Sequence, residues 1–226
     1  MRRALFSSVL SAVALCLTTT ATLAHDHKTH DHAHHNDHAH SHDAEAAQKI
    51  YKGYFEDAQI ADRPLADWAG TWQSVYPYLQ DGTLAPVMEA KAQSGDKTAA
   101  DYTAYYEIGY KTDVARVEIN ANGDFVFRKT DGTSFSGSYM SDSFEVLTYA
   151  KGNRGVRFIF KKTFGDADAP AYIQFSDHRI APSKSDHYHL YWGNDRAALL
   201  EEVAHWPTFY PAGLSGADIL QEMLAH

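Results

Sequence analysis

Cysteine is almost absent from this sequence, which has 226 residues and 14 histidines but only Cys16. A single cysteine excludes an internal disulfide and any metal site built from several thiolates. Positive charge is also scarce, because 20 Lys and Arg stand against 29 Asp and Glu and the formal net charge is −9. This balance argues against nucleic acid and against acidic membrane lipids as partners.

Motifs of the common enzyme classes are missing as well. The sequence has no H-E-x-x-H, no G-x-S-x-G, no P-loop and no Rossmann glycine pattern. Its hydrophobic content of 44%, with 13% aromatic residues, predicts a folded chain with a sizeable core. We therefore expect a compact, acidic protein that is not an enzyme.

Long apolar stretches are absent apart from one at the N-terminus. Two arginines, an apolar run and a small-residue stretch over residues 1–24 predict a secretory signal peptide that is cleaved after Ala24. Cys16 leaves a lipoprotein as the alternative, although the bulky Leu15 before it does not fit that motif. Cleavage would remove the cysteine and leave 20 − 2 = 18 basic residues, a net charge of −11. We expect a periplasmic protein without membrane insertion, mostly monomeric.

What is abundant is histidine, concentrated in the low-complexity segment 25–43, HDHKTHDHAHHNDHAHSHD. This segment cannot be buried, and we expect it to be disordered without a ligand. Metal capture by many imidazoles is the favoured interpretation; an engineered tag or a solvated linker are the alternatives. The predicted accessory ligands are His25, His27, His30, His32, His34, His35, His38, His40 and His42.

The rest of the chain, residues 44–226, is predicted to form a single domain that is mainly β with added helices. Residues 43–57 and most of 78–110 have helical patterns, and residues 197–203 and 217–224 are expected to form closing helices. Seven or eight short strands predict an antiparallel barrel or sandwich. Beyond a strand that begins near residues 68–77, they are expected at 114–121, 125–127, 135–140, 144–149, 156–160, 172–175 and 188–192.

Three histidines near the end of the strand-rich region form the predicted metal site. His187 and His189 are two residues apart on a strand and so share one face, and His178 follows the neighbouring strand. Neutral imidazole suits Zn²⁺, with Cu²⁺, Ni²⁺ and Co²⁺ as competitors, and three ligands leave a fourth position open. Asp177 and Asp186 precede two of these histidines and are predicted to orient them.

The roles of two further histidines and two alternative functions remain to be considered. His205, beside Trp206, is interpreted as structural, whereas the terminal His226 is a possible accessory ligand. The open fourth position would also suit a zinc-dependent hydrolase or hydratase, although no general base is recognisable. An apolar-ligand carrier is the other alternative, because Gly70-Thr71-Trp72 resembles the first strand of lipocalin-like barrels.

Several stretches of residues 44–226 resemble the ZinT (YodA) family of bacterial periplasmic zinc-binding proteins. They are DWAGTWQSVYP at 67–77, GVRFIF at 155–160, YIQFSDH at 172–178, IAPSKSDHYHLYWGND at 180–195 and WPTFYP at 206–211. The resemblance implies a calycin-like β-barrel that binds a metal at one end through His178, His187 and His189. It also implies delivery of zinc, under zinc limitation, to an uptake ABC transporter through its solute-binding protein, and binding of Cd²⁺. A cysteine pair found in some relatives is missing here.

Overall fold

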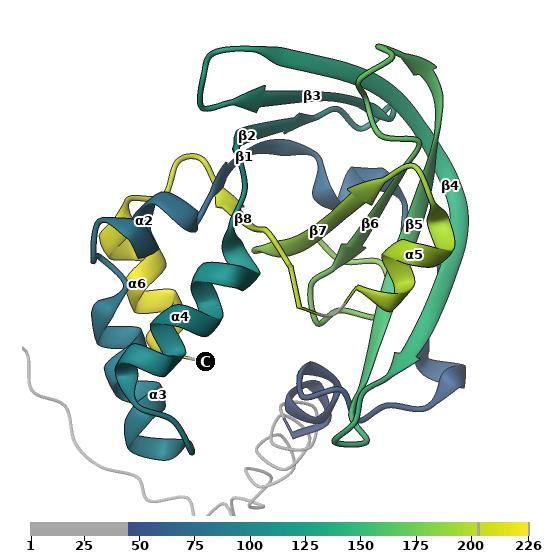
Figure 1. Cartoon of the computed structure of the whole chain (residues 1–226). Coiled ribbons are helices and arrows are strands. Elements are labelled where there is room, and N and C mark those ends of the chain that lie inside the picture. Colours follow the sequence, from purple (N-terminus) through teal and green to yellow (C-terminus); the bar gives the residue numbers. More distant parts are fainter. Residues whose placement is uncertain (1–44, 203, 226) are drawn as a thin grey trace, which may run out of the picture.

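The computed structural model describes residues 45–202 and 204–225, and its centre is a closed antiparallel β-barrel (Figure 1). The predicted signal peptide (1–24) and the histidine-rich segment (25–43) lie outside the described residues.

Eight strands form the barrel in sequence order. They are β1 (Gly70–Ser74), β2 (Val114–Ile119), β3 (Asp124–Lys129), β4 (Ser134–Thr148), β5 (Arg154–Gly165), β6 (Tyr172–Ser176), β7 (Tyr188–Gly193) and β8 (Thr208–Pro211). Each strand pairs with the next, and β8 pairs with β1 to close the sheet, with Gln73 opposite Tyr210. Closure leaves no edge strand, so every strand has two neighbours. The predicted fold class is confirmed.

The helices lie in the connections. Two 3₁₀ turns, η1 (Asp57–Gln59) and η2 (Leu65–Trp68), precede β1, and residues 45–51 are helical. Three helices separate β1 from β2, one separates β7 from β8, and one follows β8. These are α2 (Tyr76–Gln80), α3 (Ala85–Ser94), α4 (Ala99–Tyr110), α5 (Arg196–Glu201) and α6 (Gly216–Leu224). Capping boxes at Thr98 and Ser215 fix the starts of α4 and α6.

Two hydrophobic cores hold these parts together. The barrel interior is filled by inward side chains of the strands and by Trp68, which stacks on Phe175 with 4.5 Å between ring centroids. A second core joins α2, α3, α4 and α6 at one side of the barrel (Figure 1), around Leu84, Met88 and Ile219. Because aromatic side chains occupy the interior, the barrel does not favour the carrier of an apolar ligand that we considered from the sequence.

Three sequence predictions need correction. Residues 135–140 and 144–149 are one long strand, β4, with a register shift after Ser141 where Ser143 adopts a φ of 73°. Strand β8 was missed, since its four residues are too short for a clear alternation. Within the predicted helix 43–57, the described α-helical residues are 45–51, because Gly53 at φ 85° breaks the helix. No described helix is both long and apolar enough to cross a membrane.

Candidate metal site

The three histidines predicted to form a metal site are brought together by adjacent strands. His178 follows β6, His187 immediately precedes β7, and His189 lies on β7 opposite Ser176. The centroids of the three rings are 5.8 Å, 6.0 Å and 6.3 Å apart. The juxtaposition therefore follows from strand pairing and from the two-residue period of β7.

The cluster lies on the outer face of the barrel wall, at the end where β6 stops and β7 begins. Tyr188 and Leu190 are fully buried in the barrel interior. Since side chains alternate along a strand, His187 and His189 point outward. There they face the helical part of the molecule, and His187 stacks on Tyr210 of β8 with centroids 5.1 Å apart.

Hydrogen bonds define the tautomers of His178 and His187. The Nδ1 of His178 lies 3.1 Å from the carbonyl oxygen of Tyr51, which can only accept. The Nδ1 of His187 lies 3.3 Å from a carboxylate oxygen of Glu222, which also accepts when ionised. Both Nδ1 atoms therefore donate, and in the neutral form of each ring the lone pair is on Nε2.

His189 reaches the same tautomer through a hydroxyl group. Its Nδ1 lies 2.7 Å from Oγ1 of Thr208, and that hydroxyl donates to the carbonyl of Trp206 at 2.9 Å. Because the hydroxyl has one proton and gives it to Trp206, it accepts from the Nδ1–H of His189. In their neutral forms all three imidazoles thus have the lone pair on Nε2, as in metal ligands whose Nδ1 atoms are hydrogen-bonded.

Burial adjusts the protonation of His189. Loss of water around the ring, with smaller contributions from His178, His187 and the positive charge of Arg157, holds the pKa of His189 well below its usual value. The ring is therefore neutral at pH 7, and a metal ion does not have to displace a proton from it.

The backbone at His178 is unusual for a non-glycine residue, with φ at 63°. Its ring stacks on Tyr51, with centroids 4.3 Å apart and planes 19° from parallel. His178 lies beyond the end of β6, so strand pairing does not hold it. The stacking on Tyr51 and the hydrogen bond to the Tyr51 carbonyl fix the orientation of its ring instead. The helical residues 45–51 therefore form part of the site.

The spacing of the rings suits one ion after a small adjustment. Three imidazoles bound to Zn²⁺ in tetrahedral geometry, with Zn–N near 2.0–2.1 Å, have ring centroids about 5 Å apart. The observed spacing is somewhat wider, and no three His, Cys, Asp or Glu side chains among the described residues stand at ligating distance of one point. Rotations about χ1 and χ2 of the histidines would close this gap.

The two carboxylates predicted to orient the histidines bind arginines. Asp177 is 5% exposed, and its carboxylate accepts from Arg63 at 2.6 Å and from the Trp68 indole at 3.1 Å. Asp186 pairs with Arg179 at the surface. The residues bonded to the ring Nδ1 atoms, namely Tyr51, Thr208 and Glu222, were not predicted, because they lie 19 to 127 positions away in the sequence.

The remaining histidines do not enlarge the described cluster. His205 is exposed and its ring bonds to the carbonyl of Lys111, which fits the structural role expected for it. The nine histidines of residues 25–43 and the terminal His226 lie outside the described residues, so their accessory role stays a prediction.

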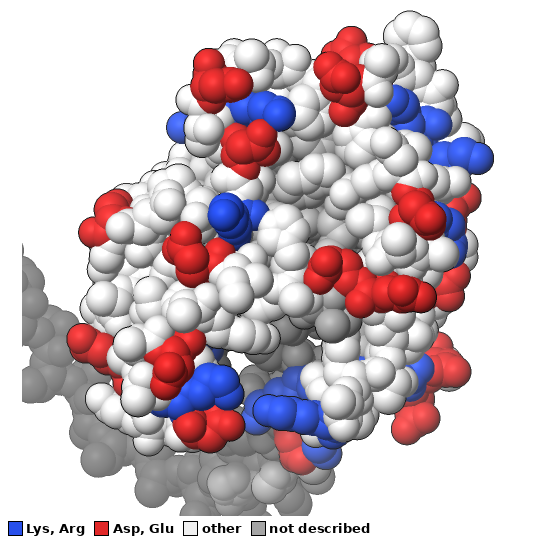
Figure 2. Space-filling view, in the orientation of Figure 1, with Lys and Arg blue, Asp and Glu red and all other residues white. Residues whose placement is uncertain are grey.

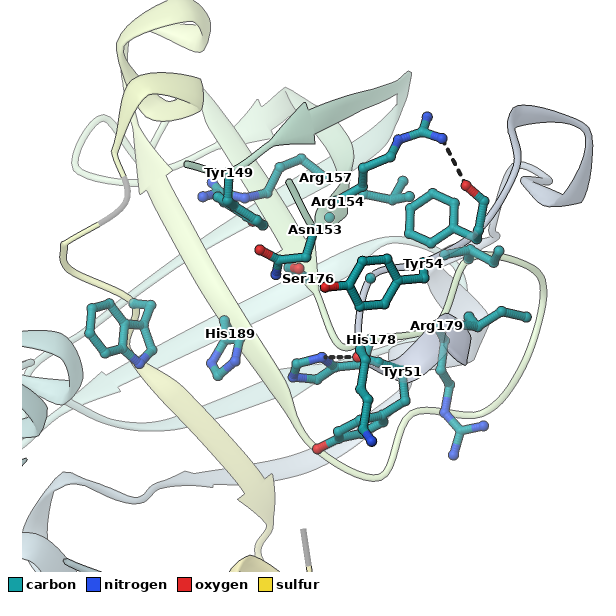
Figure 3. Close-up of a pocket in the computed structure, with 18 of the residues that line it drawn as sticks. Tyr51, Tyr54, Tyr149, Asn153, Arg154, Arg157, Ser176, His178, Arg179 and His189 are labelled. Atoms are coloured by element: carbon teal, nitrogen blue, oxygen red, sulfur yellow. Dashed lines mark hydrogen bonds between the residues drawn. The ribbon is translucent and has the colours of Figure 1, made fainter. Parts of the chain in front are cut away.

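A large cavity of about 650 Å³ adjoins the cluster (Figure 3). It lies over the outer face of β5, β6 and β7, and its lining includes His178, His189, Arg157, Tyr149 and Asn153. A second cavity of about 370 Å³ is lined by all three histidines and by aromatic side chains of α4. The cluster is thus reachable by a small ligand from outside the barrel.

Comparisons with known proteins agree with this arrangement. The chain is 54% identical over 183 residues to the probable metal-binding protein YrpE of Bacillus subtilis, a match spanning 80% of this chain and 72% of YrpE. It is 49% identical over 187 residues to the zinc-binding protein AdcA of Streptococcus pyogenes. This match spans 80% of this chain but only 36% of AdcA.

A solved structure and a family model extend these matches. The Zn(II)-bound ZinT-like domain of Streptococcus pneumoniae AdcA superposes with a TM-score of 0.74 at 49% identity, covering 77% of this chain and 97% of that domain. Residues 46–226 match the model described as "ZinT (YodA) periplasmic lipocalin-like zinc-recruitment". The chain therefore belongs to the ZinT family, as its sequence motifs indicated.

Proposed function

We propose that this protein binds Zn²⁺ through the Nε2 atoms of His178, His187 and His189. The observation that carries the proposal is that three adjacent imidazoles have their Nδ1 atoms committed to acceptors, so that three Nε2 lone pairs belong to one cluster. Neutral imidazole suits Zn²⁺, and Cd²⁺, Ni²⁺, Co²⁺ or Cu²⁺ are chemical substitutes. The similarity to a zinc-binding protein and to a Zn(II)-bound domain supports this choice.

The biological role that we propose is zinc recruitment after export. A signal peptide over residues 1–24 would direct the chain to the periplasm, where it captures zinc under limitation. It would then buffer the ion or deliver it to the solute-binding protein of a zinc-uptake ABC transporter. The description of the family as periplasmic and zinc-recruiting supports this role, and we assign no catalytic reaction.

The histidine-rich segment 25–43 would act as the collector for the cluster. Tyr51 contacts His178, so the segment is tethered only a few residues upstream of the site. Weak, interchangeable binding on a short tether raises the effective metal concentration at the cluster. His226 would be a further accessory ligand, since Glu222, four positions earlier in the sequence, contacts His187.

A titration of the protein with Zn²⁺ in competition with a chelator tests the proposal. Changing His178, His187 and His189 together to Ala should abolish the tightest site and leave several weak ones, whereas deletion of residues 25–43 should retain it. His205→Ala is the matched control, because that ring bonds to a backbone carbonyl outside the cluster. Retention of the tightest site in the triple variant, or its loss on deletion of the segment, would refute the assignment.

A further inference from the structure

The cavity of about 650 Å³ beside the histidine cluster is lined by basic side chains but by no acidic ones among the described residues (Figure 3). None of the described residues that line it is acidic, although the chain has more acidic than basic residues. Its lining cations are Lys52, Lys151, Arg154, Arg157 and Arg179. In Figure 2, basic side chains lie below the hollow in the lower part of the molecule, and acidic side chains also lie around it.

Two of the lining arginines are neutralised by carboxylates. Arg154 pairs with Asp57 and donates to the carbonyl of Phe55 at 2.8 Å. Arg179 pairs with Asp186, and Figure 3 shows its side chain extending away from the rest of the cavity. These two arginines therefore add little positive potential to the cavity.

Arg157 differs from both, because it is buried without a carboxylate. Its side chain is 1% exposed, and its guanidinium donates to the carbonyls of Leu199 at 3.2 Å and Glu202 at 2.9 Å, with a longer contact to Gln174. It lies 3.3 Å above the ring centroid of Tyr191, and its Nε has no hydrogen-bond partner among the described residues. Neutral oxygens and a π face hold the group in place, no carboxylate among the described residues hydrogen-bonds to it, and only the more distant carboxylate of Glu202 offsets part of its charge.

Binding of a divalent ion at the cluster would increase this excess of positive charge. Imidazole ligands bring no negative charge, Glu222 at His187 supplies one, and the nearby Asp177 and Asp186 already pair with Arg63 and Arg179. The ion and Arg157 together would contribute three positive charges around a partly buried cavity, where uncompensated charge is costly. A ligand that brings negative charge and an oxygen donor would reduce this cost.

We infer that the cavity binds a small carboxylate whose oxygen ligates the metal held by the three histidines, with Arg157 as its counter-charge. The inference rests on the proposed metal site. Zinc accepts carboxylate oxygen beside imidazole, and a site with three protein ligands leaves a position for it. Tyr149, Asn153 and Ser176 line the cavity between Arg157 and His178 and supply polar groups for the rest of the ligand (Figure 3).

The size of the cavity indicates the ligand class. A volume of about 650 Å³ lies within the range of small-molecule sites. It has room for a ligand of amino-acid or dicarboxylate size together with several water molecules. Zinc would then be held as a ternary complex of protein, ion and small carboxylate.

Cobalt provides the readout, because its visible absorption reports the ligand set and Co²⁺ prefers the same imidazole donors. The protein is loaded with Co²⁺ and titrated with acetate, and separately with acetamide, which has nearly the same shape but no charge. A saturable change in the cobalt bands is expected with acetate and none with acetamide, at constant pH and ionic strength.

Variants identify the counter-charge. Arg157→Met should weaken acetate binding by roughly tenfold to hundredfold, the effect of losing a charge-assisted contact, whereas Arg157→Lys should retain most of it. Arg154→Met is the matched control, because it removes a lining arginine that already pairs with Asp57; acetate binding should stay within about twofold of the original.

The outcomes separate this inference from the proposed function. If Co²⁺ fails to bind at the cluster, the metal site itself is wrong. If Co²⁺ binds normally but its absorption bands do not change with acetate, or change equally with acetamide, the carboxylate site is refuted. Should Arg157→Met not fold, the contrast between acetate and acetamide in the unaltered protein still decides. An acetate affinity unchanged in a folded Arg157→Met variant would also overturn the role of Arg157.

Discussion

The ion pair between Asp177 and Arg63 gives the most direct test of how this fold supports its site. Arg63 is 1% exposed, and its guanidinium bonds to Asp177 at 2.6 Å, to Asp67 at 2.9 Å and to the carbonyl of Ser183 at 2.7 Å. It also lies 4.0 Å above the Trp68 ring. This network ties the turn before β1 to the segment that carries His178.

Asp177→Asn keeps the shape of the side chain and removes its charge, so Arg63 is left buried with only Asp67 as a carboxylate partner. Breaking a buried pair from one side costs about 3–5 kcal/mol, and the remaining carboxylate places the expected loss near the lower value, about 3 kcal/mol. At roughly 2–4 °C per kcal/mol for a domain of this size, the melting temperature should fall by roughly 6–12 °C.

Urea unfolding of the metal-free protein, with a chelator present, measures this change without a contribution from bound ion. The matched control is Asp186→Asn, which also removes a carboxylate directly before a histidine of the cluster. Because Asp186 pairs with Arg179 at the surface, its loss should cost less than about 1 kcal/mol. Equal effects of the two substitutions would refute the reasoning that burial of Arg63 makes Asp177 indispensable.

Three further predictions concern the site and its surroundings. Thr208→Val should weaken zinc binding by roughly tenfold or more in a competition titration, because it removes the acceptor that fixes the His189 tautomer; unchanged affinity would mean that packing alone orients the ring. The pKa of His189 is lowered in the folded state, so the unfolded chain binds a proton that the folded one does not. The free energy of unfolding of the metal-free protein should therefore decrease as pH falls below about 6.5, by up to about 1.4 kcal/mol per pH unit, and His189→Gln should flatten this slope. Gly53→Ala should destabilise the protein more than Gly82→Ala in thermal melts: both glycines have positive φ, but a Cβ at Gly53 would lie 2.4 Å from the carbonyl oxygen of Arg154, whereas Gly82 faces open space.

The sequence predicted the barrel because its strands repeat a simple pattern. In β2 and β3, the inward residues Val117, Phe125 and Phe127 alternate with more exposed residues, most of them polar, and Asn122-Gly123 marks the hairpin between them. Strand β8 has only four residues and depends on pairing with β1, more than 130 positions earlier in the chain. Local alternation carries no information about such a partner, so this strand was missed.

The difference between local sequence patterns and long-range contacts also explains which parts of the metal site were predicted. Two residues of separation on β7 place His187 and His189 on one face, and strand pairing brings His178 beside them, so the cluster follows from local rules. The partners of the ring Nδ1 atoms come from the N-terminal helical residues, from β8 and from α6. Adjacency to His178 predicted an orienting role for Asp177, but Arg63, 114 positions away, binds its carboxylate.

The three acceptors that hold the imidazoles belong to widely separated parts of the chain, at Tyr51, Thr208 and Glu222. The imidazoles keep these orientations only while the helical residues 45–51 and helix α6 stay in contact with the cluster. Retention of the proposed cargo and integrity of the domain are therefore thermodynamically linked, and each stabilises the other. Fraying of the terminal helix, or cleavage between residues 51 and 57, would release a bound ion even if the eight strands stayed paired.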